Sequence, residues 1–113
     1  MTGNRQAFDV AIRRGHAFAR QQGWDKAIVE YRRALAEFPD DLGALVAAAA
    51  VSVNLKRLPD ALTMLQHANQ IKPDDLTTLD RLADVQTQLS KLSEAARTYA
   101  ALGDLHSRNL AEL

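Results

Sequence analysis

The sequence predicts an all-α protein built from three consecutive helix pairs. The motif Pro-Asp-Asp-Leu occupies residues 39–42 and returns unchanged at residues 73–76, a shift of 34 residues. The same shift relates Ala27 to Ala61 and Ala95, so the chain contains three copies of one unit. Apolar residues recur at spacings of three and four, whereas no useful run alternates apolar with polar residues. We therefore expect helices and no strand.

We predict the first helix pair at residues 5–21 and 24–37. Ile28 and Tyr31 belong to an apolar stripe on the second of these helices, and such a stripe needs a neighbour to cover it. Gly15 on the first helix lacks bulk, which lets Tyr31 pack across the pair. Asp25 stands near the start of the second helix, where we expect it to act as a cap.

We predict the second pair at residues 41–54 and 59–71. Pro39 cannot continue the preceding helix, and Asp40 and Asp41 can cap the free N–H groups of the next one. Pro59 sits just inside the start of its helix, where a missing N–H group costs nothing. Leu65 takes the place of Tyr31 in the apolar stripe.

We predict the third pair at residues 75–89 and 93–111. Pro73 ends the helix before it, with Asp74 and Asp75 as caps, and Ser93 is expected to cap the last helix. Tyr99 repeats the large apolar position of the stripe.

Residues 23–41, GWDKAIVEYRRALAEFPDD, together with the period of 34, resemble the tetratricopeptide repeat family. The resemblance covers about residues 8–109. It implies one domain over residues 1–113, with repeats at 8–41, 42–75 and 76–109, and with 110–113 as a helix extension or a truncated cap. It also implies an α-solenoid, a short right-handed superhelix whose first helices line a concave groove and whose second helices form the convex back.

Composition and net charge limit which classes of partner we expect for this protein. Apolar residues make up 47% of the chain and charged residues 25%, as in a soluble globular domain. Fourteen Lys and Arg balance fourteen Asp and Glu, so no overall positive field favours nucleic acid or an anionic membrane as partner. The most apolar stretch, residues 42–53, is too short to span a bilayer, and residues 1–12 lack the apolar core of a signal peptide. We expect a cytoplasmic protein.

No pattern indicates catalysis, a metal site or a cofactor. Cysteine is absent, and the three histidines lie on different predicted helices without paired ligand spacing: His16, His67 and His106. The five glycines form no phosphate-binding cluster. Positive charge is concentrated in the first repeat, at Arg13, Arg14, Arg20, Arg32 and Arg33. No aromatic residues are interleaved there, so we expect a solvated surface rather than an RNA platform.

The resemblance therefore implies a non-catalytic scaffold that binds a peptide or a helix in the concave groove. By alignment the first repeat contributes Asp9, Ile12, Arg13, His16 and Arg20. The second contributes Gly43, Val46, Ala47, Ala50 and Asn54. The third contributes Thr77, Asp80, Arg81, Asp84 and Gln88. This lining favours a segment that is acidic at one end and apolar in the middle.

One subtype of the family grips the acidic C-termini of heat-shock chaperones with two lysines, two asparagines and an arginine. The matching positions here are Ile12, His16, Ala47, Thr77 and Arg81. Only the arginine fits, so four of the five donors are missing. A groove without them does not offset the desolvation of a C-terminal carboxylate, and we expect no clamp function.

The alternative function is self-assembly. From residue 42 to 55 only Ser52 and Asn54 are polar, and a helix that is apolar on all sides is normally covered on all sides. Helix propensity of alanine is the other explanation of this composition. Leu105, Leu110 and Leu113 extend an apolar face beyond the last repeat. These residues predict either a longer protein or a contact with a second copy, most simply a two-fold homodimer.

Overall fold

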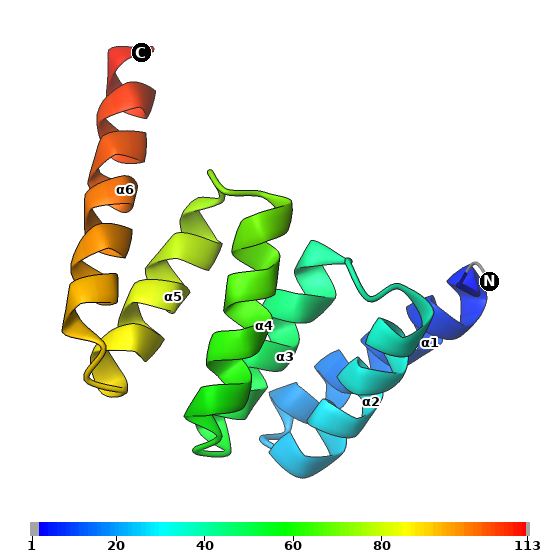
Figure 1. Ribbon diagram of the computed structural model, residues 1–113. Coiled ribbons are helices and arrows are strands. Elements are labelled where there is room, and N and C mark those ends of the chain that lie inside the picture. Colours follow the sequence, from blue (N-terminus) through cyan, green and yellow to red (C-terminus); the bar gives the residue numbers. More distant parts are fainter. Residues whose placement is uncertain (1–2, 113) are drawn as a thin grey trace.

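The computed structural model describes residues 3–112, which form six α-helices and no strand (Figure 1). The helices are α1 (Arg5–Arg20), α2 (Trp24–Glu37), α3 (Leu42–Asn54), α4 (Leu58–Ile71), α5 (Leu76–Gln88) and α6 (Leu92–Ala111). Each predicted helix is present, and each of its ends lies within one residue of the predicted boundary.

Each helix packs against the next one in the chain. The pairs α1–α2, α3–α4 and α5–α6 make the most extensive contacts, and α2–α3 and α4–α5 join one pair to the next. Figure 1 shows the pairs following one another across the molecule, with α2 and α4 in front of α1 and α3. The chain is thus an all-α helical-repeat solenoid, elongated to 40 × 31 × 27 Å.

The core is repeated between successive pairs rather than gathered at one centre. Tyr31 of α2 packs in one cluster with Ala48 and Val51 of α3. Leu65 of α4 packs in the next cluster with Leu82 of α5. The second helix of a pair is therefore covered by the first helix of the following pair.

Small residues set the helix spacing, as the sequence predicts. Ala27 and Ala61 are completely buried and Ala95 is 3% exposed, so all three repeats place alanine at an inward contact. A Cβ atom added at Gly15 would lie 2.5 Å from the Tyr31 ring, closer than any real contact. Glycine at this position is what allows the tyrosine ring to lie against α1.

The turns between repeats are capped by one aspartate each. Ala44 N donates to Asp41 Oδ2 at 2.9 Å, and Thr78 N donates to Asp75 Oδ2 at 3.0 Å. The first aspartate of the motif has a different role in the first turn, since Asp40 Oδ1 lies 2.8 Å from the Nε2 atom of His67.

The predicted caps Asp25 and Ser93 are wrong. The N-cap residues of α2 and α6 are Gly23 and Lys91, and neither helix start has a side-chain cap. Asp25 and Ser93 lie one residue inside the helix, beyond the capping position. Pro59 does lie in the first turn of α4, as predicted.

The turn within each pair repeats in backbone geometry. One residue per turn is in the left-handed region with φ near 60°: Gln22, Lys56 and Ser90, spaced by 34 residues. In each turn the following N–H group donates at 2.8 Å to a carbonyl oxygen of the preceding helix, that of Phe18, Ser52 or Gln86. A backbone hydrogen bond thus closes the end of the first helix in each pair. The left-handed position in this turn is occupied by a residue other than glycine in all three repeats.

The position of α3 accounts for its apolar composition. Lying between the first and third pairs, it buries Leu45, Ala48, Val51 and three further residues, and only Gly43 and Asn54 along it are exposed. The third helix does not present the open apolar surface that its sequence suggests, because neighbours on both sides cover most of it.

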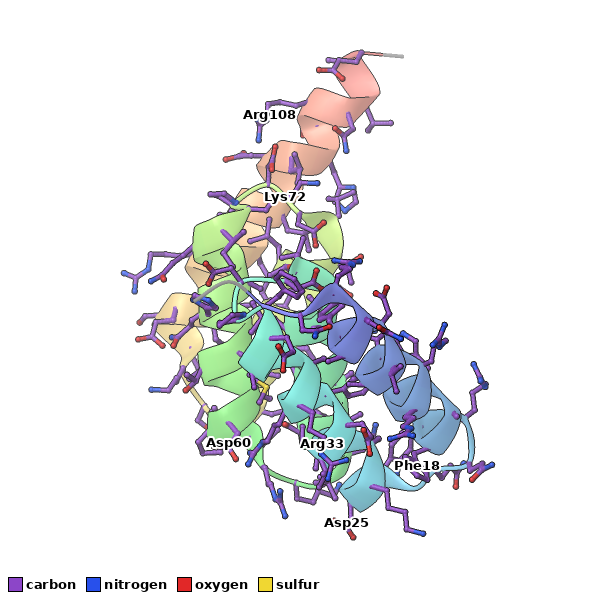
Figure 2. All side chains as sticks on the ribbon, turned by 90° about the vertical axis from the view of Figure 1, so that its right-hand side faces the viewer. Phe18, Asp25, Arg33, Asp60, Lys72 and Arg108 are labelled. Carbon is purple, nitrogen blue, oxygen red and sulfur yellow. The ribbon has the colours of Figure 1, made fainter. Side chains whose placement is uncertain are left out.

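The C-terminal leucines have different environments. Leu105 is buried, 7% exposed, and so offers little to a second copy, contrary to the prediction. Leu110 is 68% exposed, and Leu113 lies outside the described residues. Residues 106–112 are all exposed, on the part of α6 that projects beyond the body, where Figure 2 shows Arg108.

Candidate functional site

The structure brings four of the predicted groove residues together around one hollow. Ala50 and Asn54 of α3 and Arg81 and Asp84 of α5 line a cavity of about 180 Å³. Its remaining lining is apolar and comes from Ala49, Val53, Leu65 and Val85. This hollow between α3 and α5 has an apolar floor and a polar rim.

Two rim residues are oriented by contacts within their own helices. Asn54 Nδ2 donates to the carbonyl oxygen of Ala50 at 3.1 Å, and Gln88 Nε2 donates to Asp84 Oδ2 at 3.1 Å. Arg81 is exposed and forms no ion pair with any of residues 3–112. Its guanidinium group therefore keeps its hydrogen-bond donors available for a ligand.

A second hollow of about 640 Å³ lies between α5 and α6. It includes four predicted groove residues of α5, namely Thr77, Asp80, Arg81 and Asp84. It is completed by four residues that are not among the predicted groove residues: Leu76, Tyr99, Leu102 and His106. The available signal was the repeat, since Tyr99 stands where Tyr31 and Leu65 stand in the earlier pairs.

The groove residues of α1 divide into exposed and structural ones. Arg13, His16 and Arg20 are exposed, as a binding surface requires. Asp9 lies 3.3 Å from Arg5 in an ion pair on the same helix. Ile12 is half-buried and packs against the core clusters, so its principal role is structural.

The residues of α3 and the rest of α5 lie as follows. Val46, Ala47 and Ala50 are half-buried, so they offer a shallow apolar strip rather than protruding side chains. Thr77 and Gln88 are exposed.

His16 is held by a contact that sequence reasoning missed. Its Nδ1 atom lies 2.6 Å from the hydroxyl oxygen of Tyr31, across the first helix pair. Burial raises the pKa of the Tyr31 phenol, while the nearby Arg20 charge opposes the rise. The phenol therefore stays neutral at physiological pH and fixes the imidazole by a hydrogen bond.

Within residues 3–112 no three His, Asp or Glu side chains are close enough together to hold a metal ion. In the same range, every helix is too short or too polar to cross a membrane. What the arrangement offers is a surface with one apolar hollow, flanked by cations on α1 and by acids on α5.

Comparison with known proteins assigns the fold. A family model described as tetratricopeptide repeat matches residues 19–89, more than half of the chain. No curated protein sequence matches significantly.

Several solved structures share the architecture. The TPR2B domain of yeast Sti1, in a complex with pHsp70, has a TM-score of 0.83 and 19% identity, covering 91% of this chain and 82% of that chain. The first TPR of Spaghetti (RPAP3), bound to the HSP90 peptide SRMEEVD, has a TM-score of 0.86 and 21% identity, covering 93% of this chain and 83% of that chain. The TPR domain of Arabidopsis OM64 has a TM-score of 0.83 and 22% identity, covering 91% and 85%. With the period of 34, the six helices and the family match, the chain belongs to the tetratricopeptide repeat family.

Proposed function

We propose that the chain is a non-catalytic protein-interaction scaffold that binds a peptide segment or a partner helix on the face formed by α1, α3 and α5. The hollow around Ala50, Asn54, Arg81 and Asp84 carries this proposal, because it combines an apolar floor with polar groups that can orient a ligand. Two structural neighbours are described as complexes with Hsp70 or HSP90 peptides, which supports peptide binding by this architecture.

The charges along the face suggest the chemistry of the ligand. Arg13 and Arg20 on α1 favour an acidic end, and the hollow beside Ala50 accepts a small or medium apolar side chain. Asp80 and Asp84 on α5 favour a basic or polar residue at the other end. Because the net charge is zero, this polarity orients the ligand more than it attracts it from a distance.

A selection experiment tests this binding mode. We expect a display library of random peptides, selected on the purified chain, to yield sequences with acidic residues on one side of an apolar residue. Ala50→Glu places a charge in the hollow and should weaken those peptides about tenfold or more, measured by fluorescence anisotropy. Thr63→Glu, on the exposed surface of α4, is the matched control and should leave affinity unchanged.

Two results would contradict the proposal. One is a set of selected peptides that bind Ala50→Glu as tightly as the unmodified chain while circular dichroism shows both proteins folded. The other is binding that Thr63→Glu abolishes, which would place the ligand on the convex side.

Acidic chaperone C-termini are not the ligands we propose. Of the five clamp positions, Ile12 and Ala47 are apolar and half-buried, and the ring of His16 is engaged by Tyr31. Only Arg81 offers an exposed cationic donor. Titration with the peptide SRMEEVD, followed by calorimetry, should therefore show no saturable binding in the micromolar range. Tight binding that disappears in Arg81→Ala would contradict this prediction.

A further inference from the structure

The last helix pair lacks a cover that the first two pairs have. Tyr31, Leu65 and Tyr99 occupy the same repeat position, and they are 2%, 1% and 49% exposed. Tyr31 is covered by α3 and Leu65 by α5. Within the described residues, no helix lies on α6 in the same way.

We call this surface the C-terminal face, formed by Asp80, Arg81, Asp84, Tyr99, Leu102 and His106. Its apolar part is formed by Tyr99, which is 49% exposed, and by the half-buried Leu102, and Leu92 is 67% exposed two turns earlier on α6. The carboxylates of Asp80 and Asp84 lie on its rim and form no ion pair with any residue from 3 to 112. Arg81 is the single arginine on the face, so carboxylates outnumber guanidinium groups there and the face fits a helix that carries unpaired cations.

The opposite end of the molecule presents such a helix. Arg13 and Arg14 of α1 are exposed and without ion-pair partners among residues 3–112. Between α1 and α2 lies a further hollow, of about 510 Å³, whose lining includes Val10 and Arg14. The repeat equivalents of Val10 are Ala44 and Thr78, and both are buried next to a preceding helix pair. By the repeat, this hollow therefore lies where a preceding helix pair would pack.

The internal repeat supplies the register of this contact. Arg81 of α5 lines one hollow with Ala50 and Asn54 of α3. A shift of 34 residues turns Ala50 and Asn54 into Asp84 and Gln88, and a shift of 68 turns Arg13 into Arg81. If α1 of a second copy lies on α5 as α5 lies on α3, its Arg13 meets Asp84.

The neighbouring arginine fits the same register. The repeat equivalents of Arg14 are Ala48 and Leu82, which pack near Tyr31 and Leu65 respectively. Arg14 of a second copy would therefore reach Tyr99. A guanidinium group stacks favourably on an aromatic ring. The ring of Tyr99 can therefore accommodate Arg14 of the second copy, whereas a pocket enclosed by alkyl groups could not.

We propose that copies of this chain associate head to tail, with α1 of one copy seated on the C-terminal face of the next. Charge complementarity supports this arrangement, because Arg13 of one copy then meets Asp84 of the next. A head-to-tail dimer still has one free α1 and one free C-terminal face, so association continues beyond the dimer and extends the groove from copy to copy. Arg13 and Asp84 also belong to the proposed groove, so the association is tested on the chain without a ligand.

Sedimentation velocity of the unliganded chain tests the proposal. The average mass should increase steadily with concentration and pass twice the monomer mass of 12.4 kDa. Arg13→Glu and Asp84→Arg each place like charges at the junction, and each should weaken association about tenfold or more. The double variant Arg13→Glu/Asp84→Arg restores opposite charges and should regain association, as should an equimolar mixture of the two single variants.

Arg97→Glu is the matched control, a charge reversal on the side of α6 that lines a hollow with α4, away from the C-terminal face. It should associate like the unmodified chain. Circular dichroism melts establish that each variant is folded. A chain that stays monomeric at all concentrations overturns the proposal, and so does a mass that levels off at the dimer. Failure of the double variant to regain association also overturns it, because the two residues would then not meet.

Discussion

Tyr31 and Tyr99 are tyrosines at the same position of the repeat, yet they differ in burial and in the contacts they make. Tyr31 is 2% exposed, packs against the next helix pair, and its hydroxyl group is hydrogen-bonded to Nδ1 of His16. Tyr99 is 49% exposed at the edge of a hollow. The repeat position therefore does not determine burial. The presence of a following helix does, since each pair in a solenoid contacts only its neighbours.

Other equivalent positions of α2, α4 and α6 differ in burial in the same way. Ile28 and Leu62 are 4% and 9% exposed, whereas Ala96 at the equivalent position is exposed. Ala34 and Ala68 are fully buried, whereas Leu102 is only half-buried. We therefore expect the third pair to be the least stable part of the chain when it is monomeric.

The largest expected effect comes from truncating the two tyrosines. Tyr31→Ala removes a buried ring and should lower the free energy of unfolding by about 3 kcal/mol or more. Tyr99→Ala removes a half-exposed ring and should cost less than about 1 kcal/mol. Urea denaturation at low protein concentration measures both. Equal losses would show that the third pair is as well covered as the first.

A smaller effect is expected from overpacking the central repeat. Ala61 is completely buried at the helix contact, so Ala61→Leu should cost about 1–3 kcal/mol. Ala96→Leu, on the uncovered surface of α6, should change the stability of the monomer by about 0.5 kcal/mol at most. Thermal or urea unfolding compares the two variants. A neutral Ala61→Leu would contradict the packing described for the second pair.

The cap of α5 should contribute about 1 kcal/mol, lost in Asp75→Ala. The Thr78 hydroxyl, which donates to Asp75 at 2.7 Å, lowers the pKa of this carboxyl group, helped by the Thr78 N–H group and the Lys72 charge and opposed by partial burial. A lowered pKa in the folded state stabilises the fold above the ordinary carboxyl pKa of about 4. This stabilisation is lost as the pH falls through the folded-state value.

Unfolding of the wild-type chain and Asp75→Ala across acidic pH measures this contribution. The difference between the two should shrink below a pH of about 4. A difference that stays constant to lower pH would show that the ionised carboxylate does not stabilise α5.

The smallest expected effect is a gain. Lys56 has φ of 63°, a conformation that side chains other than glycine adopt at a cost. Lys56→Gly removes this strain but increases the entropy of the unfolded chain, so we expect a net stabilisation of about 0.5 kcal/mol. Arg57→Gly, at the next residue with φ of −99°, should give no gain. A stability loss in Lys56→Gly would contradict the assigned turn geometry.

Local chemistry explains how much of this fold the sequence predicts. The motif of Pro39 to Leu42 and its copy stop one helix and cap the next within a few residues, so the turns need no distant information. The helix ends are therefore predicted to within one residue. The predicted caps Asp25 and Ser93 are wrong because the turns before α2 and α6 are closed by backbone hydrogen bonds that follow a residue with left-handed φ. No polar side chain in the sequence indicates this kind of turn.

The sequence by itself determined the period, the six helices and the small residues at their contacts, since these depend on spacing along one chain. Tertiary structure decided which apolar faces are covered: α3 is covered on both sides, Leu105 is buried, and Tyr99 is left open. It also decided that Arg81 and Asp84 meet Ala50 in one hollow and that His16 meets Tyr31. Burial and contacts between helices depend on which helix packs against a given residue. The repeat predicts the same burial for equivalent residues in every copy, although only some of them are covered by another helix.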